Sequence, residues 1–210
     1  MVRTGARIQR YLLPVEAFGI IAGSGWASGI NLYLVTLLLG VAGRLGWSDI
    51  PQVLTRTDVM IVAGVLFGIE FVADKVPYLD SVWDAAHTVI RPLGAAALGA
   101  VIAGDSGSIG AALGAAVAGA LALDAHAAKA TTRVVANTSP EPVSNVVLSF
   151  FEDVGVTLLV ALAITFPVIT VIVVAILVVA ATTITVVLWK VAMRAWRRVG
   201  QWMGRGTAFT

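Results

Sequence analysis

The sequence has no cysteine and few charged residues. The missing cysteines exclude disulfide bonds, thiolate metal sites and thiol nucleophiles. Asp, Glu, Lys and Arg together make up 12% of the 210 residues, which is about half of the roughly 25% found in soluble domains. A protein with so little charge is not a typical soluble domain, and its surface must face something other than water.

Recognisable catalytic motifs are also missing. The chain has no hydrolase nucleophile elbow, metalloprotease helix pair or dinucleotide fingerprint. The glycine-rich segment Gly104 to Gly110 lacks the Lys-Ser/Thr ending of a phosphate-binding loop. We therefore expect no enzyme activity and no cofactor. An enzyme acting on lipid head groups, with a metal held by Asp and His, remains a third option, and the metal is unknown.

The sequence is rich in apolar residues, which account for 59% of the chain, with a mean hydropathy of +0.93. Crossing a hydrocarbon core takes roughly 20 apolar residues. The apolar runs predict an all-α, polytopic membrane bundle with about six spans, at residues 18–43, 58–73, 93–104, 109–123, 146–167 and 168–189. The third and fourth runs are short, so they are either tilted full spans or half-helices buried in protein.

One membrane domain covers the chain, with a bundle at residues 17–189. Basic residues gather in the flanking segments, 1–16 and 190–210. Because Lys and Arg concentrate on the cytoplasmic side, an even number of spans puts both termini in the cytoplasm. This pattern predicts a multi-pass protein of the inner membrane and no nucleic acid partner. The lipid bilayer is the expected partner, and a homo-oligomer or a second membrane protein are further options.

The two halves of the predicted bundle share two features. The first and fourth spans are interrupted by glycine, and the second and fifth carry acids. Three spans per half would give the halves opposite orientations, as in transporters built from inverted repeats with broken helices. A 3+3 inverted repeat is therefore one reading of the pattern.

The segment Pro77 to Ile90 is unusually polar for this chain. Asp80, Asp84, His87 and Arg91 follow spacings of four, three and four residues, so they share one face of a helix. We expect an amphipathic helix near the membrane surface, ended by Pro92. Its polar face is either solvated or part of a cation or proton site, since Asp and His one turn apart can both reach one ion.

Further charges lie at the ends of apolar helices. Acids within a membrane helix are costly unless they are paired or hydrated. Packing the helix ends together predicts one cluster near the cytoplasmic side, with candidate binding residues Glu70, Asp74, Asp124, His126, Glu152 and Asp153, and with candidate pairing bases Lys75, Arg91, Lys129 and Arg133. The cluster either binds a cation or proton or is a structural ion-pair network.

Gly110, Gly114 and Ala118 follow a small-xxx-small spacing. Such spacing lets helix backbones approach closely. We expect Gly110 and Gly114 to serve helix packing.

Several of these motifs together resemble a known family. They are the glycine-rich opening with Ala27-Ser28-Gly29, the string Glu70-x-x-x-Asp74-Lys75-x-Pro77-x-x-Asp80, Arg91-Pro92, and Ser139-Pro140-Glu141-Pro142 followed by Glu152-Asp153. From about residue 17 to residue 167, the chain resembles the uncharacterised bacterial membrane family called domain of unknown function 4126. The resemblance implies a small polytopic inner-membrane protein and carries over no substrate or catalytic residue.

Two functions fit these observations. The first is transport of a small solute or ion, by a transporter or a channel-like protein, with the acidic and histidine cluster coupling to a cation or proton. The alternative is a non-transporting accessory or assembly subunit, in which the glycine faces pack against a partner and the charges are structural.

Overall fold

The computed structural model describes residues 14–47, 50–137 and 142–205. These residues form α2 (Val15–Arg44), α3 (Thr57–Ala73), α4 (Leu79–Ile102), the short 3₁₀ helix η1 (Gly104–Ser106), α5 (Gly107–Ala136), α6 (Pro142–Thr165) and α7 (Pro167–Arg205). No strand occurs in these ranges, so the predicted all-α bundle is confirmed. The basic residues at positions 3, 7 and 10 and the Pro140-Glu141 part of the polar connection lie outside the described residues.

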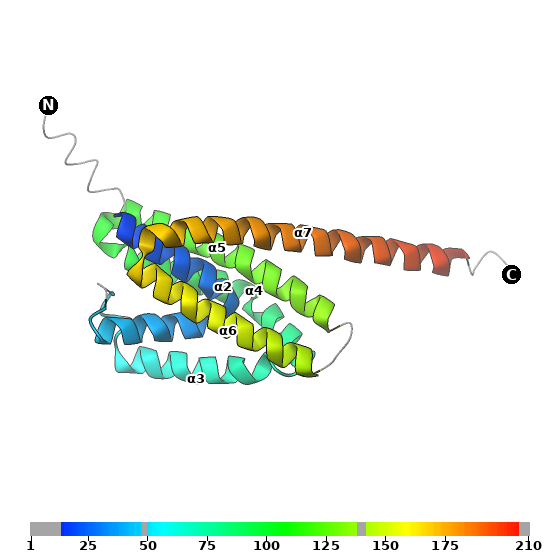
Figure 1. Ribbon diagram of the computed structural model, residues 1–210, viewed down its shortest axis with the longest axis horizontal. Coiled ribbons are helices and arrows are strands. Elements are labelled where there is room, and N and C mark those ends of the chain that lie inside the picture. Colours follow the sequence, from blue (N-terminus) through cyan, green and yellow to red (C-terminus); the bar gives the residue numbers. More distant parts are fainter. Residues whose placement is uncertain (1–13, 48–49, 138–141, 206–210) are drawn as a thin grey trace, which may run out of the picture.

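By length and composition alone, five helices among the described residues could cross a membrane: Val15–Arg44, Leu79–Ile102, Gly107–Ala136, Val143–Thr165 and Pro167–Arg194. The first of these includes residues on both sides of a break. The chain is therefore a membrane protein, as predicted from its composition. The 17-residue α3 runs beside them over much of the length of the bundle (Figure 1).

The helix α2 is broken at Asn31, where φ is −149° and ψ is 94°. A Cβ atom at Gly23, before the break, would lie 2.7 Å from Cβ of Ala163. Ala163 lies in α6. Val41 and Ala42, after the break, line a small cavity together with Ile164, the residue next to Ala163. The chain therefore enters the bundle, turns at Asn31 and returns to the end at which it entered (Figure 1).

The expectation of one crossing over residues 18–43 is thus wrong. Each half of α2 is about 20–24 Å long at 1.5 Å per residue, which is shorter than a hydrocarbon core of about 30 Å. The two halves form a re-entrant hairpin, and glycines allow it to fit inside the bundle. A Cβ atom at Gly25 would lie only 2.7 Å from Cα of Ala118, and one at Gly29 would overlap the carbonyl oxygen of Ala122.

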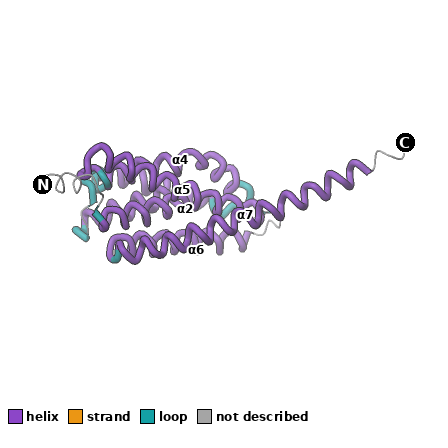
Figure 2. The backbone as a smooth tube through the Cα atoms, turned by 90° about the horizontal axis from the view of Figure 1, so that it is seen from above, coloured by secondary structure: helices purple, strands orange, loops and turns teal. Residues whose placement is uncertain are grey.

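The helices α3 to α7 then alternate in direction between two ends of the bundle (Figure 1). We call the end with Val15, Arg44, Ile102 and Thr165 the hairpin end, and the end with Ala73, Leu79, Ala136 and Val143 the network end. The described chain starts at the hairpin end, and α7 finishes beyond the network end. Seen from above, the last part of α7 extends away from the other helices (Figure 2).

The predicted surface helix at residues 77–90 is part of a longer helix. The helix α4 continues through Pro92 to Ile102. Proline has no N–H, so the carbonyl of Thr88 loses one helical hydrogen bond, a loss that membrane helices tolerate when other groups compensate. The four polar residues on its face are buried, and so they point into the protein and not toward water.

The short runs at residues 93–104 and 109–123 belong to full-length helices, α4 and α5. These two helices pack closely, since a Cβ atom at Gly114 would overlap the carbonyl oxygen of Gly99 and lie 2.8 Å from Cβ of Ala103. A Cβ atom at Gly110 would overlap Cβ of Ser106 in η1 and lie 3.6 Å from the carbonyl oxygen of Ala103, at the end of α4. The inverted-repeat reading paired the first span with the fourth, which lies in α5. Because α5 is continuous, it has no break that corresponds to the break in α2.

Candidate functional site

Three basic side chains form the centre of a buried ion network in the network half of the bundle. They are Arg91 of α4 and Lys129 and Arg133 of α5, and the side chains of all three have 0% exposure. Lys129 and Arg133 are four residues apart and so share one face of α5. The close packing of α4 on α5 places Arg91 against that face.

Each base has at least one close carboxylate partner. Arg91 donates from Nη2 to Oε1 of Glu70 (2.6 Å) and from Nη1 to Oδ1 of Asp84 (2.9 Å). Lys129 donates to Oδ2 of Asp74 (2.6 Å). Charge-assisted bonds of this length are the strong class of protein hydrogen bonds.

Arg133 links the network to α6 and to the network end. Its Nη2 donates to Oε2 of Glu152 at 2.5 Å, and its Nη1 lies 3.8 Å from Oδ2 of Asp80. Asp80 also accepts hydrogen bonds from the side-chain amides of Asn137 (2.8 Å) and Asn145 (3.3 Å). The two asparagines close the network at this end, and sequence reasoning missed both, because an isolated amide near a helix end usually faces water.

The tip of the α2 hairpin meets the network at its inner end. The carbonyl of Ile30 accepts a hydrogen bond from Lys129 (3.1 Å), and that of Gly29 accepts one from Arg91 (3.4 Å). Cations at a helix C-terminus are favoured by the helix dipole. The break therefore lies where two bases can satisfy the carbonyls that it frees.

Asn31 joins the two halves of the hairpin. Its Oδ1 accepts a hydrogen bond from the backbone N–H of Leu34 (2.9 Å), so it caps the second half-helix. Its Nδ2 donates to Oδ1 of Asp153 (3.1 Å). Asn31 was another site residue that the sequence did not reveal, although its place among small residues in an apolar run is the available signal.

The two histidines contact the network in different ways. His126 accepts from Arg91 at Nδ1 (2.8 Å), since a guanidinium can only donate, so its Nε2 carries the proton near Thr88. His87 donates from Nδ1 to the carbonyl of Trp83 (2.8 Å), and its Nε2 shares a hydrogen bond with the hydroxyl of Tyr33 (2.9 Å). The contact with Arg91 thus requires a neutral ring at His126.

The geometry does not join Asp84 and His87 at one ion, because Asp84 bonds to Arg91 and His87 to Tyr33. Within the described ranges, no three side chains of the His, Asp and Glu types converge as a metal-ligand set.

Two of the candidate residues lie apart from the centre. Asp124 faces α2 and α7, where it accepts hydrogen bonds from Nε1 of Trp26 (3.3 Å) and from the hydroxyl of Thr182 (2.7 Å). Lys75 lies at the network end, with its ammonium 3.0 Å from the ring centroid of Phe71 and 3.1 Å from the hydroxyl of Ser149. Burial lowers the pKa of Lys75 below its ordinary value.

The network holds more acids than bases. Five carboxylates, those of Glu70, Asp74, Asp80, Asp84 and Glu152, lie within 4.0 Å of the three bases. Three of these acids and the nearby Asp153 each have one buried oxygen without a hydrogen-bond partner: Glu70 Oε2, Asp74 Oδ1, Asp84 Oδ2 and Asp153 Oδ2. A buried excess of negative charge is unfavourable, and it favours the uptake of protons or cations.

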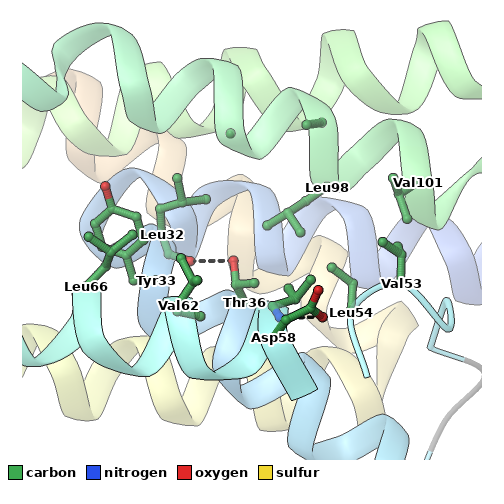
Figure 3. A pocket seen from close by; sticks show the side chains of 14 residues that line it. Leu32, Tyr33, Thr36, Val53, Leu54, Asp58, Val62, Leu66, Leu98 and Val101 are labelled. Carbon is green, nitrogen blue, oxygen red and sulfur yellow. Dashed lines mark hydrogen bonds between the residues drawn. The ribbon is translucent and has the colours of Figure 1, made fainter. Parts of the chain in front are cut away.

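An apolar groove approaches the network from the hairpin side. Its volume is about 450 Å³, and it lies between the second half of α2, α3 and α4. Figure 3 shows Leu66, Tyr33 and Leu32 toward one end of this groove and Val53, Leu54 and Asp58 toward the other. Tyr33 is also the hydrogen-bond partner of His87, so it connects the groove with the buried network.

A helical bundle of membrane-spanning length, with a re-entrant hairpin whose tip contacts a buried ion network, defines a polytopic membrane protein with an internal polar site. The model of the family described as "Domain of unknown function (DUF4126)" matches residues 18–187, and the chain belongs to this family. Comparisons with curated proteins and with solved structures gave no match.

Proposed function

We propose that the protein moves a small solute or ion across the membrane, and that its ion network takes up and releases protons as part of this movement. The observation that carries the proposal is the surplus of buried carboxylates, three of which leave an oxygen without a partner beside the broken helix. A proton on such an oxygen would neutralise the surplus charge.

The position of the network supports this role. Along α4 it extends from Asp80 to Arg91, a distance of about 17 Å at 1.5 Å per residue, or roughly half of the hydrocarbon core. Broken helices that meet charged groups near the middle of a membrane are typical of secondary transporters. The network would then form the polar half of the path that the solute or ion follows across the membrane. The groove at Tyr33 would form the other half.

The orientation of the chain is part of the proposal. The hairpin returns α2 to its starting end, so we infer an odd number of complete passages, with Val15 and Arg205 on opposite sides. The placement of both termini in the cytoplasm was the expectation from the sequence, and the inferred topology differs from it. We retain the inner membrane as the location, with the basic end of α7 in the cytoplasm.

A structural role for the network is the second candidate, and one observation favours it. All three buried bases are paired, as expected of an ion-pair network that only holds helices in register. An accessory subunit would need nothing more. The two candidates differ in whether the network exchanges protons.

Proton flux into proteoliposomes tests the proposal. Purified protein would be reconstituted with a pH-sensitive dye inside, and an imposed pH gradient would be followed with potassium and valinomycin present to cancel the membrane potential. We expect faster dissipation with the parent than with empty liposomes or with Glu70→Gln. Parent and empty liposomes with equal rates would favour the accessory role.

A further inference from the structure

We propose that the wedge between α6 and α7 binds a lipophilic organic cation that enters from the bilayer. This assignment of a substrate class rests on the proposed transport function. The two helices diverge from the turn at Phe166 (Figure 1). The first half of α2 forms the floor of the wedge, through Trp26 and Ile30, and the cavity has a volume of about 620 Å³.

The wall of this cavity is apolar except at one residue. Phe151, Leu159 and Leu177 are among the apolar side chains that line it, and Glu152 is the one charged residue among the lining residues. Walls of this kind favour a ligand with a large apolar body.

Glu152 is also the most accessible acid of the ion network. Its side chain is 16% exposed, whereas those of Glu70, Asp74, Asp80 and Asp84 are between 0% and 3% exposed. Its Oε2 is bonded to Arg133, which leaves Oε1 as the oxygen able to face the cavity. Glu152 is therefore the point at which a molecule in the wedge meets the network and its surplus negative charge.

A second carboxylate lies behind the floor. Asp124 accepts its two hydrogen bonds from the neutral donors Trp26 and Thr182, and it pairs with no base in the described part of the chain. The bond to Asp124 also fixes the indole of Trp26, which lines the cavity. Carboxylates and indole faces both attract cations, and apolar walls repel hydrated inorganic ones, so the ligand chemistry is that of an organic cation.

The ligand and the proton would act on different carboxylates of one network, since the ligand meets Glu152 and the unpartnered oxygens belong to Glu70, Asp74 and Asp84. An organic cation near Glu152 would compensate part of the negative charge of the network and lower its affinity for protons. Binding of the cation would therefore release a proton. This exchange explains why a lipid-facing cavity opens onto a proton-binding network. No bond is made or broken except the O–H bond of the proton that leaves.

Binding of tetraphenylphosphonium tests the assignment. Its partner in the test is tetraphenylborate, an anion of the same shape. Equilibrium dialysis against the purified full chain in lipid nanodiscs, with empty nanodiscs subtracted, measures binding to the protein. We expect saturable binding of the phosphonium and at least about tenfold weaker binding of the borate. Equal binding of the two ions, or no saturable binding, would overturn the assignment.

Two glycine variants locate the site. Gly155 lines the cavity, and a Cβ there meets nothing within 4 Å, so Gly155→Leu should fill the wedge without disturbing the fold. Gly64 of α3 is equally open and lines none of the cavities described above, so Gly64→Leu is the matched control. We expect loss of phosphonium binding in the first variant only. Val173→Trp, from the α7 wall, is the second test if Gly155→Leu melts at a lower temperature than the parent.

The outcomes also separate this inference from the proposed function. Proton flux without selective phosphonium binding would overturn the substrate class and leave proton coupling intact. Selective binding that Gly155→Leu removes, in a protein without proton flux, would support the cation site and contradict the coupling.

Discussion

The contacts of Lys129 explain why breaking one ion pair of the network would lower the stability of the protein. Its ammonium is fully buried and lies 2.6 Å from Asp74, with Glu152 and Glu70 at 3.6 and 3.7 Å. Removing one partner of a buried pair leaves the other charge uncompensated, which is worse than never having the pair. The sequence named all of these residues as candidates, but not which of them are bonded.

Asp74→Asn is expected to lower the free energy of unfolding by about 1–3 kcal/mol, because Lys129 loses its shortest hydrogen bond but keeps Glu152 and Glu70 within 3.7 Å. Asp58→Asn is the control, since Asp58 forms an exposed pair with Arg56, and the side chains are 63% and 62% exposed. Exposed pairs are screened by solvent and contribute little to stability. Denaturation of both variants in detergent measures the difference, and equal midpoints would show that the pair with Lys129 is not stabilising.

The element that most distinguishes the fold is the hairpin of α2. Its break depends on Asn31, which caps the second half-helix and bonds to Asp153. Asn31→Ala should cost about 1–3 kcal/mol, since it removes the cap and leaves Asp153 without this donor. Asn31→Ser should recover part of the loss, because a serine hydroxyl can also cap. Melting temperatures that are the same for both variants would argue against the capping role.

Glycine contacts between helices give a second prediction for the elements. Gly114→Ala should destabilise the protein by about 1–3 kcal/mol, because the new methyl group would press on Gly99 and Ala103. Gly64→Ala places its methyl group in open space and should be neutral or stabilising by up to about 1 kcal/mol. Thermal denaturation compares the two. A Gly114→Ala variant as stable as Gly64→Ala would mean that this helix contact is loose.

The sequence predicted the helices better than their directions. Hydropathy identifies apolar segments, but it does not register a reversal, so residues 18–43 were expected to be one crossing. The break at Asn31 has no strong local signal, because its cause is tertiary: bases on α4 and α5 satisfy the carbonyls freed there. Pro92 led to the opposite error, because the helix was expected to end before it and α4 continues through it. An isolated helix would end before a proline, whereas a packed membrane helix can continue.

For the whole molecule, the hairpin predicts the membrane topology. Reporter fusions after Asn137 and after Arg205 should report the same side, because both positions lie at the network end. Fusions at Gln52 and before Val15 should both report the opposite side. A fusion before Val15 that reports the same side as one after Arg205 would mean that α2 crosses the membrane completely.

The sequence predicted that the charged residues would lie close together, but it did not predict which of them would be bonded to each other. Spacing placed Asp80, Asp84, His87 and Arg91 on one helix face, and this face is the one that meets α5. Which side of the helix is buried depends on the neighbouring helices, and so the choice between a solvated face and an internal site needed the structure. The distances then showed that His87 bonds to Tyr33 and that Asp84 bonds to Arg91.

The central claim is that the buried carboxylates exchange protons, and infrared spectroscopy of the protein in lipid measures this directly. A protonated carboxyl group in a dry site absorbs separately from a carboxylate. We predict such a band in the parent, declining as the pH rises and weakened in Glu70→Gln, with Asp58→Asn unchanged. A parent with no titrating carboxyl band, or a band that is as strong in Glu70→Gln as in the parent, would contradict the account.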